Sequence, residues 1–381
     1  MYSTTLNISK IIIAGPCAAE SREQLFAAAK ELFDLRINYP VAASGDKEDR
    51  HSERSEESQE IANQVRNTEG DFWDFRFFRV GVWKARTNPK DFQGVGKDAL
   101  VWLQEIKKQF GFKICVEVAS AEHVQLCIEH NVDAVWIGAR STVNPFLVQE
   151  IADAVQDSSL AVFIKNPINP DLNLWVGAIK RFQNSGIKNI MAIHRGFSVE
   201  NENVYRNAPC WEIPMALRMK QPNIPILCDI SHIAGNVLLQ QTVAQTAINH
   251  GFDGLMIEVH PNPAQALSDS KQQLLPSQFI HLLENITFPT SNNIADNTLL
   301  IQRNLIKNID IQISKLLNKR MAVVDEIAAI KAKHALPLLQ PDQWKKVVEI
   351  YDENALEDEN YRQFLEEFLL LLHRSSLRRQ G

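Results

Sequence analysis

The sequence predicts an α/β fold in which a (β/α)8 barrel is followed by an all-α region. Short apolar runs alternate with longer amphipathic stretches through residues 1–285, and this alternation ends abruptly after them. Eight strands that alternate with helices over about 250 residues are typical of a closed parallel barrel. A doubly wound open sheet is the alternative, but no GxGxxG motif follows the first apolar run.

Composition narrows the class of protein. The chain has 381 residues, of which 45% are hydrophobic and 23% charged, so two globular domains with a large core are expected. No apolar run is long enough for a membrane span, and the N-terminus does not have the pattern of a signal peptide. The net charge of -6 argues against a nucleic-acid partner. Five cysteines without a CxxC pair indicate a reducing compartment, the cytoplasm.

The barrel strands are expected where the apolar runs are richest in Ile, Val and Phe. Amphipathic stretches such as "GKDALVWLQEIKKQF" and "NPFLVQEIADAVQ" separate most of these runs and predict the intervening helices. The eight predicted strands cover residues 11–14, 75–82, 112–118, 134–138, 161–165, 189–193, 225–229 and 254–259.

One polar segment interrupts the alternation. Residues 41–70 carry eight acidic and four basic side chains and no aromatic residue. Such a segment cannot bury enough apolar surface to offset the entropy lost on ordering. We interpret it as an insertion between the first helix and the second strand, most simply a solvated loop without a function of its own.

The last part of the chain has a helical pattern. Residues 286–297 predict a polar linker, and residues 298–381 predict an all-helical domain. Its three helices are expected at about 296–334, 342–353 and 358–379. The first of these is long enough to need a packing partner.

The stretch "IIIAGPCAAES" places Cys17 just after the first predicted strand. A free cysteine by itself is more often a small buried hydrophobe than a reactive thiolate. Its position at the carboxyl end of a barrel strand raises a second possibility, because barrel enzymes keep their active sites at that end. The residues that follow the other strands therefore decide between the two interpretations.

Two carboxylates and an imidazole lie in equivalent positions. His232 follows the seventh strand in "CDISH", Glu258 ends the eighth in "MIEVH", and Asp269 lies in the next loop. Together with Cys17 they offer sulfur, nitrogen and oxygen donors, a set suited to a borderline divalent metal. Manganese, iron, cobalt and zinc all remain possible on these residues.

Five cations end other strands or lie in the loops that follow them. So many like charges can converge on one rim only if an anion bridges them, and phosphate is the obvious candidate. These residues are Lys84, Arg86, Arg140, Lys165 and Arg195.

At this point the sequence resembles a known family. The motifs "AGPCAAES", "KARTNPKDFQGVG", "IGAR", "IHRGF", "CDISH" and "GFDGLMIEVHPNPAQALSD" are similar to those of the type I beta 3-deoxy-D-arabino-heptulosonate 7-phosphate (DAHP) synthases. The likeness covers residues 10–285 apart from the insertion. It implies a TIM barrel that condenses phosphoenolpyruvate with erythrose 4-phosphate, the first step of the shikimate pathway.

The resemblance also implies roles for individual residues. Cys17, His232, Glu258 and Asp269 would bind the divalent metal. Phosphoenolpyruvate would be held by Arg79, Lys84, Arg140, Lys165 and Arg195, and erythrose 4-phosphate by Arg86 and Thr87. Glu117, Ala139 and Asp229 complete the expected substrate site. Lys84, Arg86, Lys165 and His232 are the expected catalytic residues.

The nearest alternative is a 3-deoxy-D-manno-octulosonate 8-phosphate synthase, a related barrel with the same phosphoenolpyruvate chemistry. That family typically has Lys-Ala-Asn-Arg where this chain has Lys84, Ala85, Arg86 and Thr87. The arginine at position 86 favours the four-carbon sugar phosphate.

The long terminal helix carries three separated cations. Arg320 and Lys331 share a face, because eleven residues make about three turns plus 20°. Arg303 lies about 26 Å from Arg320 along the axis and about 100° away in rotation. One copy of the helix cannot bring all three to a small ligand, whereas an antiparallel second copy can. A shared site would therefore require a homodimer through the helical domain.

This region resembles the all-helical (AroQ-type) chorismate mutases, which convert chorismate to prephenate. The likeness implies that Arg303 of the partner subunit joins Arg320, Lys331, Ser376 and Gln380 around chorismate. The chain departs from the family at Gln340, Gln343 and Trp344, where an acidic residue and an Arg-Glu pair are usual. The alternative is a non-catalytic dimerisation or sensor module. In either case we expect feedback on the barrel, with prephenate as a possible inhibitor.

Overall fold

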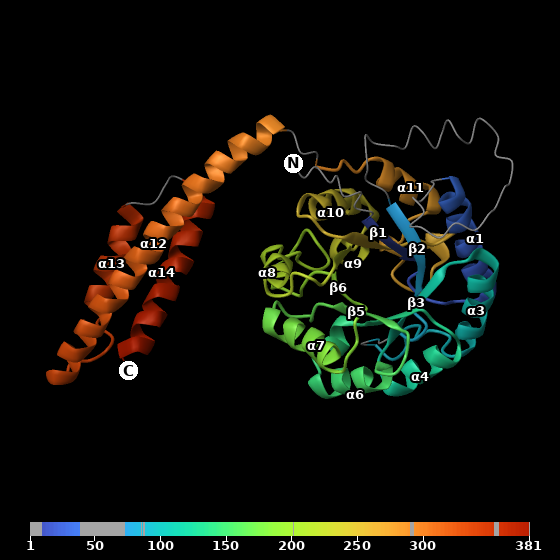
Figure 1. Cartoon of the computed structure of the whole chain (residues 1–381), viewed down its shortest axis with the longest axis horizontal. Helices are drawn as coiled ribbons and strands as arrows, with labels where there is room; N and C mark the ends of the chain where they lie inside the picture. The colour runs from blue at the N-terminus through green and yellow to red at the C-terminus, as the bar shows by residue number, and fades with distance from the viewer. Residues whose placement is uncertain are drawn as a thin grey trace, which may run out of the picture. The chain divides into compact units, whose positions relative to one another are not determined.

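The structure is a computed structural model that describes residues 10–38, 73–84, 86, 88–200, 202–289, 293–353 and 358–380. Within these residues eight parallel strands close into a barrel in sequence order, which confirms the predicted fold (Figure 1). The strands are β1 (Lys10–Gly15), β2 (Trp73–Val80), β3 (Lys113–Val118), β4 (Ala134–Ile137), β5 (Ala161–Lys165), β6 (Ile190–His194), β7 (Ile226–Asp229) and β8 (Gly254–Glu258). The predicted insertion, 41–70, lies outside the described residues, as does Thr87.

Helices surround the barrel (Figure 1). They are α1 (Arg22–Asn38), α3 (Asp98–Phe110), α4 (Ala121–Glu129), α5 (Ala139–Thr142), α6 (Pro145–Val155), α7 (Leu172–Asn184), α8 (Glu212–Lys220), α9 (Ile230–Ala234), α10 (Val237–Asn249) and α11 (Pro276–Glu284), with 3-10 turns η1 (Pro263–Gln265) and η2 (Ser270–Gln272) after β8. Side chains of Ser120, Asn144, Asp171 and Asn236 cap the N-termini of α4, α6, α7 and α10. None of the helices in the described ranges is long and apolar enough to cross a membrane.

The barrel closes between β1 and β8, where Ile13 lies opposite Met256. Gly15, at the end of β1, has a φ of 151°, and a β-carbon there would overlap the carbonyl oxygen of Arg79. The glycine in "IIIAGPC" therefore lets β1 approach β2 closely and places Cys17 directly above the barrel.

The strands bury both faces, which explains why their sequences are almost continuously apolar. Outward-facing residues pack against the surrounding helices in the larger core. Inward-facing residues fill the barrel with a separate apolar plug, formed by Ile13, Phe77, Cys115, Ala134, Trp136, Phe163, Ile193, Leu227 and Met256. The barrel is therefore a packed core with a single open end for chemistry.

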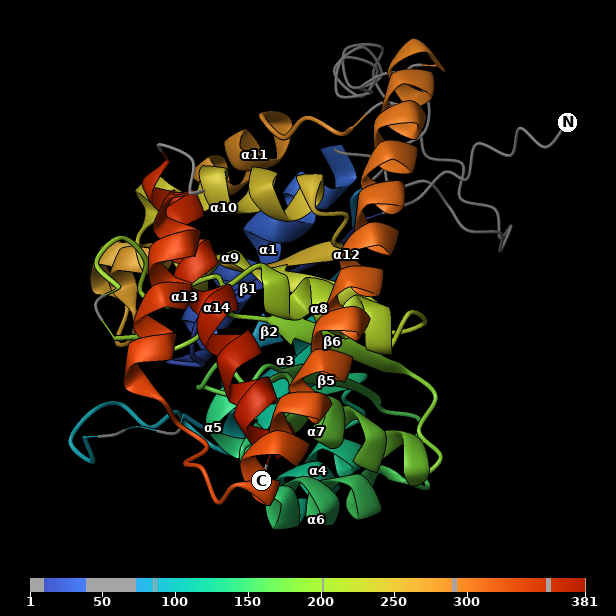
Figure 2. The same ribbon diagram turned by 90° about the vertical axis from the view of Figure 1, so that its left-hand side faces the viewer.

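The chain divides into two compact units, residues 1–289 and 290–381. The second unit consists of α12 (Asn293–Lys333), α13 (Pro341–Glu353) and α14 (Glu359–Gln380). Both α12 and α13 contact α14, and Figure 2 shows α12 extending well beyond the other two helices. Three helices were predicted in these places, and their observed ends differ from the prediction by at most three residues.

Candidate active sites

The functional side chains of the barrel form one layer above the apolar plug. Successive side chains of a strand point to opposite faces, so the residue two positions beyond a plug residue also points inward. Lys165 follows Phe163 in this way, Asp229 follows Leu227, and Glu258 follows Met256. The same spacing places Arg79, Glu117 and Arg195 in the layer.

A cavity of about 410 Å³ opens at this end of the barrel. Its lining includes seven of the predicted substrate-binding residues: Lys84, Arg86, Glu117, Ala139, Arg140, Lys165 and Arg195. Two of the predicted metal ligands, His232 and Asp269, line it as well. The structure thus brings the five predicted cations to one cavity. Arg206 and Asn207 also line it and were not predicted from the sequence.

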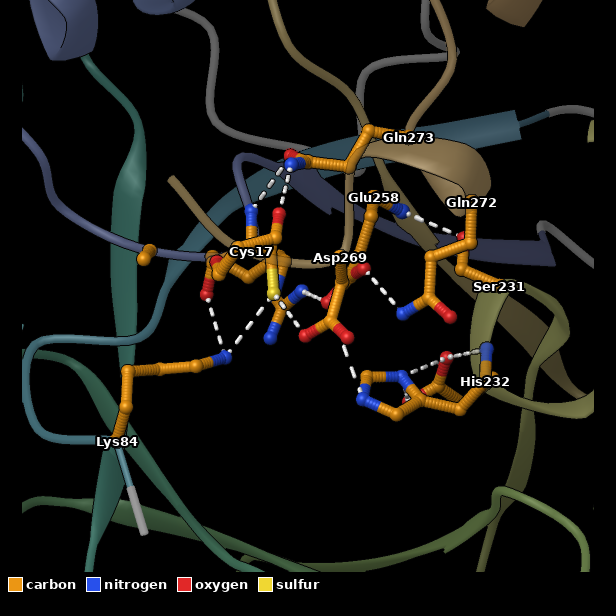
Figure 3. Close-up of polar contacts among 12 residues, drawn as sticks. Cys17, Lys84, Ser231, His232, Glu258, Asp269, Gln272 and Gln273 are labelled. Carbon is orange, nitrogen blue, oxygen red and sulfur yellow. Dashed lines mark hydrogen bonds and ion pairs between the residues drawn. The ribbon is translucent and has the colours of Figure 1, made fainter. Parts of the chain in front are cut away.

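The four predicted metal ligands lie in one cluster (Figure 3). The Cys17 thiol donates to Asp269 Oδ2 at 3.2 Å and accepts from Lys84 Nζ at 3.0 Å. His232 Nε2 lies 3.9 Å from Glu258 Oε1. Cys17 and Asp269, 252 positions apart in the sequence, are therefore in direct contact.

Cations compensate the negative charge of this cluster. Arg79 Nη1 lies 2.6 Å from Glu258 Oε1, and both side chains are at most 1% exposed. Burial alone would raise the pKa of Glu258, but His232, Arg79 and Lys84 outweigh it and hold this pKa at about 2. Burial, reinforced by Glu258, raises the pKa of Cys17 to about 12, so the sulfur is a thiol in this arrangement.

The donor chemistry fits a divalent metal. As the side chains stand, no three His, Cys, Asp or Glu residues among those described are arranged to hold an ion. In this arrangement the ammonium group of Lys84 provides the positive charge beside the sulfur, because it donates to Cys17 Sγ. A thiol, an imidazole and two carboxylates nevertheless form a set that a borderline metal prefers, and a metal would deprotonate the thiol.

Asp229 orients two functional groups at once. Its Oδ2 accepts from Lys165 Nζ at 2.7 Å, and its Oδ1 lies 3.0 Å from His232 Nδ1. Burial would raise the pKa of Asp229, but His232 and Lys165 hold it well below its usual range. An Nδ1–H donated to this carboxylate leaves Nε2 of His232 facing Glu258 with its lone pair available.

Trp136 forms the floor beneath two of the buried cations. The Arg79 guanidinium carbon lies 4.8 Å, and Lys165 Nζ 5.6 Å, from the centre of its indole ring. The negative face of an aromatic ring attracts cations, and the attraction is stronger where water is excluded. This role could not be predicted from the sequence, because Trp136 has the pattern of an apolar residue in a buried strand.

Arg195 is held by neighbouring amides. Its Nη1 donates to Asn207 Oδ1 at 2.7 Å, and its backbone N–H donates to Asn166 Oδ1 at 2.6 Å. Burial lowers the pKa of Arg195 to about 10, although Asp229 partly offsets this effect. A guanidinium held in this way is already oriented before an anion binds.

The helical unit brings four of its five predicted residues together. Arg320 Nη1 donates to Ser376 Oγ at 2.7 Å, and Lys331 Nζ donates to Gln380 Oε1 at 3.0 Å. These contacts join α12 to α14. Arg303 is exposed on the same helix, about 26 Å from Arg320 along the axis.

The long helix presents a large apolar surface. Each of the following side chains is at least 40% exposed: Leu305, Ile306, Ile309, Ile311, Ile313, Leu316, Val323, Ile327 and Ile330. Contiguous exposed apolar surface of this kind marks an interaction site.

Comparison with known proteins identifies both parts. A family model described as "DAHP synthetase I family" matches residues 51–290. The chain belongs to the DAHP synthetase I family. A second family model, "Chorismate mutase type II", matches residues 302–381. The chain is therefore an enzyme that joins DAHP synthase and chorismate mutase domains of the shikimate pathway, as the sequence predicted.

Individual relatives agree with this family. The phospho-2-dehydro-3-deoxyheptonate aldolase of Thermotoga maritima is 26% identical over 275 residues, 72% of this chain and 68% of the relative. The crystal structure of that DAHP synthase superposes with a TM-score of 0.57 at 27% identity and covers 73% of this chain and 68% of its own. A 2-dehydro-3-deoxyphosphooctonate aldolase of Azoarcus sp. is 27% identical over 286 residues, 70% of this chain and 86% of the relative. The barrel is thus similar in sequence to enzymes of both names, at nearly the same identity.

Proposed function

We propose that the barrel condenses phosphoenolpyruvate with erythrose 4-phosphate to give DAHP and inorganic phosphate. The observation that carries this proposal is the cavity itself, in which five cations face a cluster of sulfur, imidazole and carboxylate donors. We assign residues 1–285 to this synthase, 286–297 to a linker and 298–381 to the mutase. The five cysteines are free thiols, which supports a cytoplasmic location.

The cations bind and orient the two anionic substrates. Lys165 ends β5 and Arg195 directly follows the neighbouring strand β6. Each is already fixed by a hydrogen bond, to Asp229 and Asn207 respectively. They would hold phosphoenolpyruvate with its carbon 3 facing the aldehyde of erythrose 4-phosphate, whose phosphate would meet Arg86. Fixing two reactants in one geometry removes most of the entropic cost of their encounter.

In the reaction, carbon 3 of phosphoenolpyruvate forms a bond to the aldehyde carbon, and the aldehyde oxygen takes up a proton. A water oxygen adds at carbon 2 and loses one proton, which gives a hemiketal. The hemiketal hydroxyl then loses its proton as the carbon–oxygen bond to phosphate breaks, and the ketone and inorganic phosphate are left. Lys84 lies at the cavity and is the group we assign to proton transfer. A divalent metal held by Cys17, His232, Glu258 and Asp269 would polarise the aldehyde carbonyl.

One assay tests this function and its alternative. Loss of phosphoenolpyruvate is measured with erythrose 4-phosphate or arabinose 5-phosphate, before and after chelation and after return of Mn²⁺. We expect turnover with the four-carbon sugar, loss of turnover on chelation and recovery with the metal. Preference for arabinose 5-phosphate would identify an octulosonate 8-phosphate synthase. Unchanged turnover after complete metal removal would contradict the proposed metal site.

For the helical unit we propose a chorismate site shared between two chains. Arg320 pairs with Ser376 and Lys331 with Gln380 between α12 and α14. Arg303 lies too far along α12 to join them in the same chain. The exposed apolar surface of α12 supports pairing with a second copy, which would bring in Arg303 of the partner subunit. The cations would hold the dianion in its compact conformer and stabilise charge at the ether oxygen.

Mixing two inactive variants tests the shared site. Arg303→Ala and Lys331→Ala homodimers each lack one side chain at both sites, whereas the mixed dimer has one complete site. After co-refolding in equal amounts we expect about a quarter of wild-type mutase activity, since half of the dimers are mixed and carry one native site. No recovery would contradict the shared site. A wild-type chain that does not consume chorismate would instead be a sensor module.

We also propose that the mutase product regulates the synthase, because one chain carries both activities. Saturating prephenate is expected to lower the synthase rate, and Lys331→Ala, with a weakened binding site, should need more of it. Identical synthase kinetics with and without prephenate would contradict this proposal.

A further inference from the structure

Two consecutive glutamines, Gln272 and Gln273, follow Asp269 and are 0% and 1% exposed. Buried amides are costly unless their donors and acceptors are used. No role was predicted for either residue, because both are uncharged and follow the last strand without a recognisable motif. Each of them is bound on one side to a predicted metal ligand (Figure 3).

Gln272 connects the two carboxylates of the cluster. Its Nε2 donates to Glu258 Oε2 at 2.7 Å, and its Oε1 accepts from Arg206 Nη1 at 2.5 Å. The same Arg206 nitrogen donates to Asp269 Oδ1 at 2.9 Å. Glu258, Gln272, Arg206 and Asp269 are therefore joined in an uninterrupted series of hydrogen bonds.

The amide of Gln272 can adopt only one orientation. A carboxylate accepts on one side and a guanidinium donates on the other, so rotation of the amide would break both contacts. Its backbone oxygen is also fixed, because it accepts from Gln240 Nε2 at 2.6 Å. One oxygen of Glu258 is thus occupied by the amide, while the other faces Arg79 and His232.

Gln273 joins the first strand loop to the turn that carries Asp269. Its Oε1 accepts from the backbone N–H of Cys17 at 2.9 Å, and its Nε2 donates to the backbone oxygen of Ser268 at 2.9 Å. Asp269 has a φ of 49°, in the left-handed region that few residues other than glycine, asparagine and aspartate adopt. The second amide therefore fixes the backbone on both sides of the Cys17–Asp269 contact.

We infer that Gln272 and Gln273 are positioning residues for the divalent metal: Gln272 orients Glu258 and Asp269, and Gln273 sets the separation of Cys17 from Asp269. This inference rests on the proposed metal site. Groups that hydrogen-bond to metal ligands restrict them to the binding geometry, and their loss commonly weakens metal binding 10- to 100-fold.

Cobalt binding to the full-length, metal-stripped protein tests the inference without an activity assay. Co²⁺ is titrated while its ligand-field and thiolate-to-metal absorption bands are recorded. Gln272→Met keeps the length of the side chain and removes both hydrogen bonds, and we expect its Kd to rise about 10- to 100-fold. Gln272→Glu should be weaker still, because it places a carboxylate against Glu258. Gln273→Met should shift or weaken the thiolate band, which reports on Cys17.

Two further variants make the outcome decisive. Gln265→Met changes an exposed glutamine of the same loop and should bind Co²⁺ as the wild type does. Arg206→Met breaks the series at a half-exposed side chain, so it keeps the test available if a buried variant fails to fold, and about a tenfold rise in Kd is expected. If the variants at Gln272, Gln273 and Arg206 all have Kd values within twofold of the wild type and unchanged absorption bands, the inference is overturned, whereas the proposed metal site is not. A wild-type protein that does not bind Co²⁺ would overturn the proposed metal site and this inference with it.

Discussion

The barrel and the helical unit differ in the partners that they provide for charged side chains. In the barrel, Arg79, Lys165, Asp229 and Glu258 are almost completely buried, and each finds an opposite charge within the same chain. In the helical unit, Arg320 and Lys331 donate to neutral acceptors, which are two side chains of α14 and the backbone oxygen of Leu338. A closed sheet excludes water by itself, whereas three helices expose their long member along much of its length.

This difference indicates which of the two sites already contains the charge partners of its buried cations. Burying a charge is favourable only when its partners are positioned at the same time, which a barrel achieves through strand register. Among the described residues, no carboxylate forms an ion pair with Arg320 or Lys331, so the attraction of these two cations for an anion is uncompensated. We therefore expect the synthase site to be sensitive to the loss of internal partners, and the mutase site to the loss of residues that meet the ligand.

The largest effect should come from the sulfur in the barrel. Cys17→Ala is expected to lower synthase turnover at least about 1,000-fold, because it removes a proposed metal ligand, and to leave mutase activity within twofold of the wild type. Steady-state assays of both activities on the same preparation measure this. Cys127→Ala, at a buried thiol of α4 outside the cavity, is the matched control and should retain synthase activity. Substantial synthase activity in Cys17→Ala at saturating metal would contradict the assignment.

A smaller and opposite pattern is expected in the helical unit. Arg320→Met should lower mutase kcat/KM by about 100-fold, since it removes a donor that stabilises developing charge, and leave the synthase unchanged. Arg379→Met removes an arginine of the same unit that pairs with Asp325 at the surface, and it should change mutase activity less than twofold. Equal losses in the two variants would mean that Arg320 acts only through folding.

The smallest effect concerns stability and distinguishes the two regions by pH. His194 is completely buried among the rings of Trp175, Phe197, Trp211 and Phe252. Burial lowers its pKa from 6.5 to about 3, so the folded barrel keeps it neutral. The stability that depends on this neutral form is complete above pH 6.5 and is lost as the pH falls toward 3, because only the unfolded chain takes up the proton.

Between pH 7.5 and pH 5 this residue should cost the barrel about 2 kcal/mol of unfolding free energy. Urea denaturation followed by barrel tryptophan fluorescence measures that cost. In His194→Phe the pH dependence should shrink by that amount. Unfolding curves of the variant and the wild type that shift equally with pH would show that His194 titrates normally in the fold.

Much of the barrel could be predicted because its rules are local. A run such as "AVFIK" is recognisable as a buried strand, and the residue at its end must lie at the open rim. Lys165, Asp229 and Glu258 were located in this way before any contact was known. The helical pattern likewise predicted α12 and its cations, and the arithmetic of the helix separated Arg303 from Arg320.

What could not be predicted depends on contacts between distant loops. Arg206 and Gln272 meet although 66 residues separate them, and nothing in either local sequence indicates the contact. Arg79 was expected to hold phosphoenolpyruvate, but its pairing with Glu258 depends on barrel closure, and its role in substrate binding stays a prediction. Trp136 has the pattern of a core residue, and only the three-dimensional packing shows two cations against its ring.

The two-residue step from plug to functional layer limits how this barrel can change over time. Adding or deleting one residue within β5 would turn Lys165 from the interior toward the helices, along with every residue beyond the change. In the loops, side chains do not alternate between two faces, so a loop can gain any number of residues without this effect. Insertions that survive natural selection should therefore accumulate between the strands, while strand lengths stay fixed or change only in pairs.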